Sequence, residues 1–367
     1  MNCVEKIAAE RKAPDILTFN NGNPVKSVAD FEKRRKEIKR LLEEHEYGYM
    51  PERPRHLRVE TVSTDTSFCA GKAPLSTLKF TVTVGEEEFS FHVYAVIPKK
   101  QERLPALVHI NFRPDVPDKY MPSEEIADRG FATFSFCYAD ITNDDADFSD
   151  GIAKLLSPKR RSKSSPGKIV MWAWAAMRVM DYIQALDNID KDNVAVAGHS
   201  VLGKSALIAG AFDERFKYVI SNCSGCSGAA LTRGKTGETL PLLASVRHYW
   251  FSPKYKDYIA HEDLIPLDQH FLLAAAAPRN LLIGSAKEDI ASDPESEFIS
   301  AHLADEVYEK IYGIKGLVHN GNIPDAPAVF DGGSIHYHIR EGTGYFSRED
   351  WLAYMNYIEK CIQGEVK

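Results

Sequence analysis

Residues 192–211, "DNVAVAGHSVLGKSALIAGA", constrain the fold more than any other stretch of the chain. The apolar, valine-rich run "VAVAG" passes without a linker into a turn at Gly198-His199-Ser200, and an apolar helical segment follows at once. A strand that turns directly into a helix is the repeating unit of α/β proteins with a parallel sheet. The stretch therefore predicts a buried strand, a sharp turn and a buried helix.

Two functional motifs fit this turn equally well. Residues 198–205 match G-x-x-x-x-G-K-[ST], the pattern of a phosphate-binding loop. Gly198-His199-Ser200 also begins a nucleophile elbow, in which a sharp turn presents a serine. The usual elbow has glycine at position 202, but Leu202 stands there and the glycine follows as Gly203. The first interpretation predicts a nucleotide-binding protein and the second an ester or amide hydrolase.

The order of the predicted elements favours the hydrolase. Residues 78–84 and 89–98 predict an antiparallel hairpin. Further strands are expected at 104–112, 130–140, 194–198, 218–223, 280–286 and 334–340, and helices at 28–46, 169–186, 294–313 and 348–362. This alternation predicts a mostly parallel sheet with helices on both faces. A phosphate-binding loop normally follows an early strand of its fold, whereas several strands precede Gly198.

We therefore assign the α/β-hydrolase fold. The hydrolase domain is expected to span residues 76–367, with insertions at about 141–168 and 224–276. Residues 1–75 are expected to form a helical and irregular extension packed on this domain. In this fold a serine, an acid and a histidine follow one another along the chain, each after a strand. Ser200 follows one strand, and Glu288, Asp289 and Asp293 follow a later one.

Several long segments resemble the glucuronoyl esterase family, in particular its bacterial branch and acetylxylan-esterase-like relatives. They include "GHSVLGKSALIAGAFDERFKYVISNCSGCSGAAL", "LDQHFLLAAAAPRNLLIGSAKEDIASDPESEF" and "HYHIREGTGYFSREDW". The family pattern is G-x-S-R-x-G-K, with the same displaced glycine. The likeness covers roughly residues 105–355.

The resemblance implies roles for individual residues. Ser200 is expected to be the nucleophile and Asp289 the acid, with Asp293 as the alternative. A second acid position of the family falls at Cys223, which makes Asp289 more necessary. The resemblance implies that Lys204, Glu238 and Trp250 bind substrate. Asn111 is a further substrate-binding candidate, because it lies at the end of a central strand.

Two positions depart from the family. The arginine expected directly after the nucleophile is Val201, and Gly344 stands where the catalytic histidine is expected. His338 matches a strand histidine of the family pattern, and His336 shares its face because side chains alternate along a strand. We take His338 as the candidate base, with His336 as the alternative. The rival hypothesis is a catalytically impaired hydrolase fold that binds a carbohydrate or an acidic ligand.

The composition limits the classes of binding partner and the cellular compartment that we expect for this chain. A net charge of −7 argues against nucleic-acid binding, and no apolar run reaches the ~18 residues of a membrane span. The charged N-terminus does not match a secretory signal, and the six cysteines do not match a zinc pattern, so a cytoplasmic protein without metal or organic cofactor is expected. The expected partner is a small-molecule or oligosaccharide ester, and nothing in the sequence sets the oligomeric state.

Overall fold

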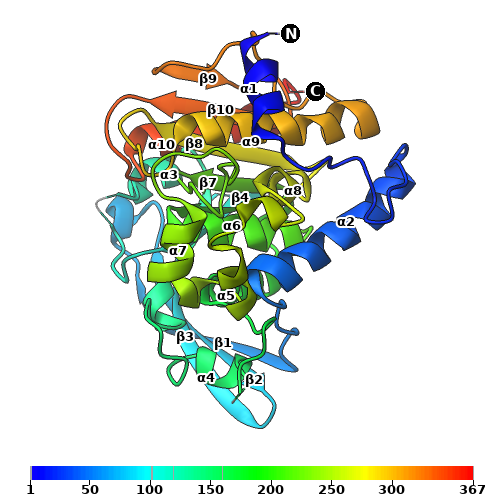
Figure 1. The fold of residues 1–367 in the computed structure, drawn as a ribbon. Coiled ribbons are helices and arrows are strands. Elements are labelled where there is room, and N and C mark those ends of the chain that lie inside the picture. The colour runs from blue at the N-terminus through cyan, green and yellow to red at the C-terminus, as the bar shows by residue number, and fades with distance from the viewer. Residues whose placement is uncertain (1, 101, 119, 159, 367) are drawn as a thin grey trace.

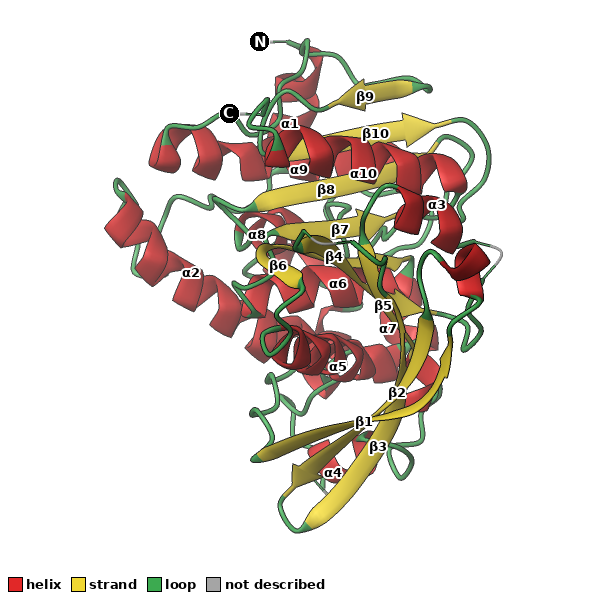
Figure 2. Ribbon diagram, turned by 180° about the vertical axis from the view of Figure 1, so that it is seen from behind, coloured by secondary structure: helices red, strands yellow, loops and turns green. Residues whose placement is uncertain are grey.

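A sheet of ten strands forms the centre of the structure, a computed structural model that describes residues 2–100, 102–118, 120–158 and 160–366. The strands lie in the order β1-β2-β3-β5-β4-β6-β7-β8-β10-β9. Their bounds are β1 His56–Asp65, β2 Leu75–Val84, β3 Glu87–Val96, β4 Leu104–Asn111, β5 Ala132–Cys137, β6 Ile189–His199, β7 Tyr218–Asn222, β8 Asn280–Ala286, β9 Ala328–Phe330 and β10 Ile335–Arg340. Figure 2 shows the strong twist of this sheet.

Six strands that are neighbours in the sheet run parallel, namely β5, β4, β6, β7, β8 and β10. By contrast, β1, β2 and β3 form an antiparallel meander at one end. β3 joins the two parts by pairing antiparallel with β5. The mostly parallel sheet and its N-terminal hairpin are therefore confirmed. Because parallel strands point the same way, the loops after β4, β6, β7, β8 and β10 meet at one edge of the sheet.

Helices cover both faces of the sheet, as predicted (Figure 1). The longer ones are α2 Val28–Leu42, α5 Lys168–Ile183, α6 Val201–Phe212, α9 Pro294–Val307 and α10 Arg348–Ile362, and the shorter ones α1 Cys3–Arg11, α3 Ser123–Asp128, α4 Ala153–Leu156, α7 Leu240–Val246 and α8 Gln269–Ala274. The large core contains α5, α6 and α9, and a second core lies between the other face of the sheet and α3 and α10. No helix of the described residues is long and apolar enough to cross a membrane.

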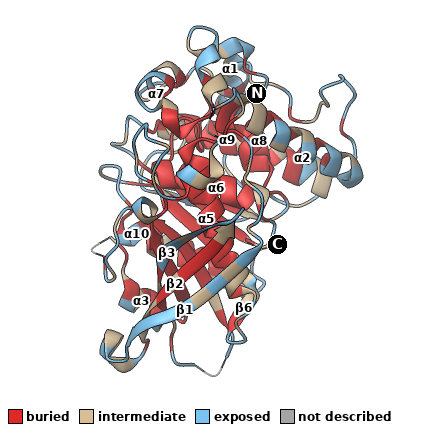
Figure 3. Ribbon diagram, turned by 90° about the horizontal axis from the view of Figure 1, so that it is seen from below, coloured by how far each residue is buried: buried red, intermediate tan, exposed pale blue. Residues whose placement is uncertain are grey.

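The N-terminal 75 residues contain more regular structure than expected. His56–Asp65 forms the edge strand β1, paired with β2, and Cys3–Arg11 forms α1. β1 is exposed along most of its length, which Figure 3 shows against the buried strands beside it. Apolar residues alternate with charged ones only in its first half, at Leu57 and Val59, and the rest of the strand is exposed, so the strand was not predicted. The domain boundary near residue 75 stays a prediction.

Candidate active site

Ser200 occupies the tight turn between β6 and α6. Its backbone has φ 54° and ψ −126°, a region that non-glycine residues rarely adopt and that carries strain. The turn needs glycine at 198, since a Cβ there would lie 2.1 Å from the carbonyl oxygen of Leu202. This geometry is that of a nucleophile elbow, and it places the serine at the carboxyl edge of the sheet.

Backbone hydrogen bonds fix Ser200 while leaving its side chain free. Its N–H donates to the Asn222 carbonyl oxygen at 2.9 Å, and its own carbonyl oxygen accepts from Gly203 and Lys204. Its hydroxyl has no hydrogen-bond partner among the residues that the structure describes. At the start of α6, the Val201 and Leu202 N–H groups have no hydrogen-bond acceptor among the described residues and are available to stabilise an anion.

Lys204, Glu238 and Trp250, the substrate-binding candidates that the resemblance implies, lie together on one side of the elbow. The buried Lys204 Nζ donates to the Ser224 carbonyl oxygen at 2.6 Å and lies 3.7 Å from a Glu238 carboxylate oxygen. It also lies 5.7 Å from the centre of the Trp250 ring. A lysine held in this way differs from the phosphate-binding loop lysine, which reaches a bound phosphate. Their contact with substrate stays a prediction.

Asp289, in the loop after β8, lies against Gly344. A Cβ on Gly344 would be 2.3 Å from Asp289 Oδ2. The same oxygen accepts from Ser292 Oγ at 2.7 Å, and Oδ1 accepts from the Ser292 N–H at 3.2 Å. The predicted acid therefore faces the position that lacks the expected histidine. Its two carboxylate oxygens accept hydrogen bonds from Ser292 instead.

Asp293, the alternative acid, caps a helix. Its carboxylate accepts from the Ser296 N–H and hydroxyl at the start of α9, and from the Thr236 N–H at 2.8 Å. These bonds satisfy the amino end of α9 and tie the 224–276 insertion to it. Asp293 therefore has a structural role as the N-cap of α9.

His336 and His338 lie on the face of β10 that α10 covers, and both are buried. His336 Nε2 lies 3.0 Å from His338 Nδ1, and His338 Nε2 lies 2.8 Å from Asp350 Oδ1. Both ring nitrogens of His338 therefore have partners, so neither is free to take a proton from Ser200. Asp350 also accepts from Arg340 Nε at 3.0 Å, which completes a buried network under the loop of residues 341–347.

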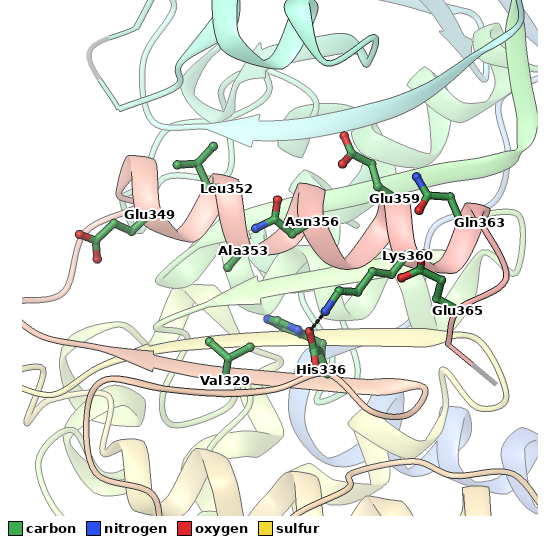
Figure 4. Close-up of a pocket in the computed structure, with 11 residues that line it drawn as sticks. Val329, His336, Glu349, Leu352, Ala353, Asn356, Glu359, Lys360, Gln363 and Glu365 are labelled. Carbon is green, nitrogen blue, oxygen red and sulfur yellow. Dashed lines mark hydrogen bonds and ion pairs between the residues drawn. The ribbon is translucent and has the colours of Figure 1, made fainter.

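The alternative base, His336, borders a groove on this same side of the sheet. The groove has a volume of about 530 Å³ and lies between α10 and the edge formed by β9 and β10. Figure 4 shows His336 at its floor, below Lys360, which pairs with Asp331. Burial lowers the pKa of His336 well below its usual value. Its one remaining ring nitrogen, Nδ1, is buried and has no hydrogen-bond partner among the described residues.

A second, smaller cavity of about 200 Å³ lies beside the elbow. Its lining comes from β4, β6 and the two loops nearest to them, and it includes His109, Asn111, Phe112, Arg113, His199, Tyr345 and Phe346. The Asn111 amide nitrogen donates to Ser135 Oγ at 3.4 Å, and its oxygen accepts from the Arg113 N–H. Its predicted contact with substrate stays a prediction. The described residues contain no cluster of three or more side chains suited to a metal ion.

His199, which also lines this cavity, was not among the candidate site residues. Its Nδ1 lies 2.7 Å from the side-chain oxygen of Asn222, and its ring packs between Phe112 and Phe346. Asn222 follows Ser200 by more than twenty residues, so no local pattern could have revealed this bond. The position directly before the serine was the only available signal.

The strained serine and the strand order β2-β3-β5-β4-β6-β7-β8-β10 define an α/β hydrolase. A family model described as "Glucuronyl esterase, fungi" matches residues 80–312. Over 96% of its length the chain is 31% identical to the carbohydrate esterase MZ0003, from an unknown prokaryotic organism, and covers 90% of that protein. The chain belongs to the glucuronoyl esterase family.

Two further relatives agree with this assignment. The solved glucuronoyl esterase from Solibacter usitatus is 29% identical and superimposes with a TM-score of 0.86, over 95% of this chain and 99% of that one. The 4-O-methyl-glucuronoyl methylesterase of Podospora anserina is 30% identical over 73% of this chain, which spans about half of that enzyme (54%). The resemblance and the fold inferred from the sequence are confirmed.

Proposed function

We propose that the chain is a serine-type carboxylic ester hydrolase that cleaves a glucuronate ester or an acetylated carbohydrate through an acyl-enzyme at Ser200. The observation that carries the proposal is the strained backbone of Ser200 (φ 54°), on a turn where its hydroxyl has no partner among the described residues. Such strain persists only where the surrounding structure enforces it, and it collects at catalytic residues. Family membership supports the same reaction class.

The reaction would follow the two-step course of serine esterases. Ser200 Oγ attacks the ester carbonyl carbon as a base removes its proton, and the alcohol then leaves with a proton. Water next attacks the acyl-enzyme and releases the acid. The oxyanion would be met by the N–H of Val201, which follows the nucleophile, and by an N–H of the segment after β4, near Phe112. The family arginine at position 201 is missing, so these N–H groups carry more of the stabilisation.

We infer the substrate class from the residues beside α6 and from the relatives. Lys204 and Glu238 form a charged pair next to the Trp250 indole, and the partly exposed Glu238 carboxylate can accept from a sugar hydroxyl. The Podospora relative is a 4-O-methyl-glucuronoyl methylesterase. We assign a uronate or acetylated sugar ester of small or oligosaccharide size to this chain.

Covalent labelling tests the proposal. The protein and its Ser200→Ala variant are treated with a fluorophosphonate and examined by intact mass. We expect one adduct on the native chain and none on the variant, together with hydrolysis of a methyl glucuronate ester. A native chain that gains no adduct and shows no hydrolysis would remove the esterase proposal.

The second candidate is a binding protein for a carbohydrate or an acidic ligand. Gly344 favours it, because the loop after β10 offers no imidazole beside Asp289. Val201 and the fully engaged His338 point the same way. Calorimetric titration with glucuronate distinguishes the candidates: binding without labelling favours this one.

We also propose a cytoplasmic location. All six cysteines are free in the structure, and Cys223 and Cys226 are buried as thiols. Free thiols are the usual state in a reducing compartment. Fractionation of the source cells with an antibody to the chain tests this, and recovery of the chain outside the cytoplasm would overturn it.

A further inference from the structure

A row of residues crosses the sheet directly beside Ser200, on the face that α10 covers. His199 of β6 is paired with Asn222 of β7, which is paired with Gly284 of β8. Gly284 is paired in turn with His338 of β10. Residues that are paired in register point to the same face of a sheet, so these side chains share one layer of the core. Polar groups in such a layer are costly unless they bond to one another.

Asn222 is held at both ends of its side chain. Its side-chain oxygen lies 2.7 Å from His199 Nδ1, and its amide nitrogen donates to the Tyr354 hydroxyl of α10 at 3.3 Å. The side chains of Asn222 and Tyr354 are both buried in the core. A buried polar network whose members are paired specifies one arrangement of its residues. The row therefore fixes Asn222 between the elbow strand and α10.

Glycine at position 284 makes the bond between Tyr354 and Asn222 possible. A Cβ on Gly284 would lie 2.2 Å from the Tyr354 hydroxyl oxygen and 2.8 Å from Asn222 Nδ2. It would also lie 2.7 Å from His338 Cε1. The Tyr354 hydroxyl thus occupies the space that a side chain on β8 would fill, and it reaches Asn222 from there.

Asn222 is bonded to the nucleophile residue as well. Its carbonyl oxygen accepts from the Ser200 N–H at 2.9 Å. β7 ends at Asn222, and the next residue, Cys223, has φ 46°, so the backbone changes direction directly after this carbonyl group. The two side-chain bonds of Asn222 therefore add to the sheet in fixing the acceptor of the Ser200 N–H.

We propose that Tyr354 and Asn222 are positioning residues for Ser200, and that α10 controls the reactivity of the nucleophile through them. The strained backbone of Ser200 (φ 54°) persists only because its surroundings enforce it. A displaced Asn222 carbonyl lets the turn relax and shifts Ser200 Oγ relative to the Val201 and Leu202 N–H groups. This inference rests on the proposed esterase function and adds to it two residues outside the predicted site.

The expected effect follows from the number of anchors. A displacement of about 1 Å at a reacting group can cost about 100-fold in rate. Loss of the Tyr354 hydroxyl removes one side-chain anchor of Asn222 and leaves the bond to His199 in place. We therefore expect a smaller loss of about 10-fold.

The test compares Tyr354→Phe with Tyr357→Phe, a matched control on the same helix. Each change removes one buried hydroxyl and keeps the ring. The Tyr357 hydroxyl donates to the Gly333 carbonyl oxygen at 2.7 Å, before the start of β10 and at the opposite edge of the sheet from Ser200. We expect the fluorophosphonate labelling rate to fall about 10-fold in Tyr354→Phe and to stay within about twofold in Tyr357→Phe.

The labelling rates separate the possible outcomes. Circular dichroism melting confirms that both variants fold, and complete labelling at long times confirms that all molecules are competent. Labelling of Tyr354→Phe at the native rate overturns the inference while leaving the esterase intact. An equal fall in Tyr357→Phe also overturns it, because the loss is then one of general packing. An unlabelled native chain overturns both the inference and the proposed function.

Steady-state kinetics give a readout that contact with substrate would move differently. Both side chains are at most 1% exposed, so neither touches a substrate. On a methyl glucuronate ester we expect kcat of Tyr354→Phe to fall while KM stays unchanged. A raised KM with an unchanged kcat contradicts a positioning role.

A double variant tests whether Tyr354 acts through Asn222. Effects of residues that act through one shared contact are not additive. The variant that combines Tyr354→Phe with Asn222→Ala should be labelled no more slowly than Asn222→Ala alone. If the two losses multiply instead, Tyr354 acts on Ser200 by another route, and the inference is wrong.

Discussion

The two sides of Ser200 differ in how much of a family active site they retain. On the α6 side, Lys204, Glu238 and Trp250 lie together. The buried Lys204 ammonium donates to the Ser224 carbonyl oxygen and pairs with Glu238. On the side of the 341–347 loop, Asp289 faces a glycine and bonds to Ser292 instead. The two sides therefore differ: the candidate substrate-binding residues lie together, whereas the candidate acid has no histidine beside it. A fold can keep its binding surface while its chemistry changes.

Restoring the missing histidine should remove this difference between the two sides of Ser200. We expect it to change the rate of ester hydrolysis more than any other substitution considered below changes activity or stability. In Gly344→His we expect the rate of ester hydrolysis to rise about 1,000-fold, the middle of the range for a general base. The backbone at 344 is not in the left-handed region, but a Cβ there would lie 2.7 Å from Asp289 Cγ and 3.2 Å from Asp289 Cβ, so the whole Asp289 side chain must shift. Initial rates on a methyl glucuronate ester measure the gain.

Gly344→Gln is the matched control, since it adds bulk without a base and should give no gain. If Gly344→His stays as slow as the native chain, Asp289 is not positioned to serve a histidine at this site.

The support of the 341–347 loop should yield the next largest effect. Asp350 accepts from His338, from Arg340 and from the Ser347 N–H, all in the interior. Asp350→Asn removes the charge that these donors share, and we expect a loss of about 3 kcal/mol in unfolding free energy. Urea unfolding at pH 7 measures it.

The pH dependence of that loss checks its cause. Burial opposes the charge of Asp350, but His338 and Arg340 outweigh burial and lower its pKa. A lowered carboxyl pKa gives stability that is present above the unfolded pKa of ~3.9 and is lost as pH falls through the folded value. The difference between variant and native chain should therefore shrink below about pH 4. A constant difference down to pH 3 would mean that packing, not charge, is responsible.

On the opposite side of Ser200, the contribution of the buried Glu297 to stability is expected to change with pH in the opposite sense to that of Asp350. Glu297 accepts from the Gly225 N–H and from Ser285 Oγ, linking the loop after β7 to the end of β8. Burial raises the pKa of Glu297 to about 7, against the effect of these bonds. The folded chain then binds a proton that the unfolded chain has lost, so this residue costs stability as pH rises from about 4.5 to 7.

Glu297→Gln keeps the shape of the protonated acid without its titration. Relative to the native chain, we expect the variant to be more stable at pH 8 than at pH 5 by about 2 kcal/mol. Guanidinium unfolding at the two pH values measures the change, with the exposed Glu288→Gln as the control. An unchanged difference between the two pH values would show that Glu297 is already ionised at pH 5.

Sequence reasoning worked best where one local pattern decides the structure. The bounds of β8 and α10 agree with those predicted, because a continuous apolar run and a Ser347 capping box mark them. The Ser200 elbow was predicted for the same reason. Family resemblance added Asp289 and the Lys204 pocket, which no periodicity could supply.

The rest depended on contacts between distant parts of the chain. The bond of His338 to Asp350 joins β10 to α10 and removes the histidine that the sequence nominated. The bond of His199 to Asn222 joins the end of β6 to the end of β7, and no local pattern predicts it. β1 was missed because its partner strand, rather than its own apolar content, holds it in the sheet.

The smallest expected effect concerns the better-preserved side and separates substrate from product. Glu238 lies 3.7 Å from Lys204 and offsets its charge. The carboxyl group of an ester substrate is neutral, whereas the released uronate is an anion. Glu238→Gln leaves Lys204 uncompensated, so we expect free glucuronate to bind about 5-fold more tightly, within the usual range for a partly exposed charge pair. Calorimetric titration with glucuronate measures this, and glucose, which has no carboxylate, should bind equally to both proteins. If glucose and glucuronate gain alike, the variant has reshaped the pocket, and Lys204 does not meet the carboxyl group of the sugar.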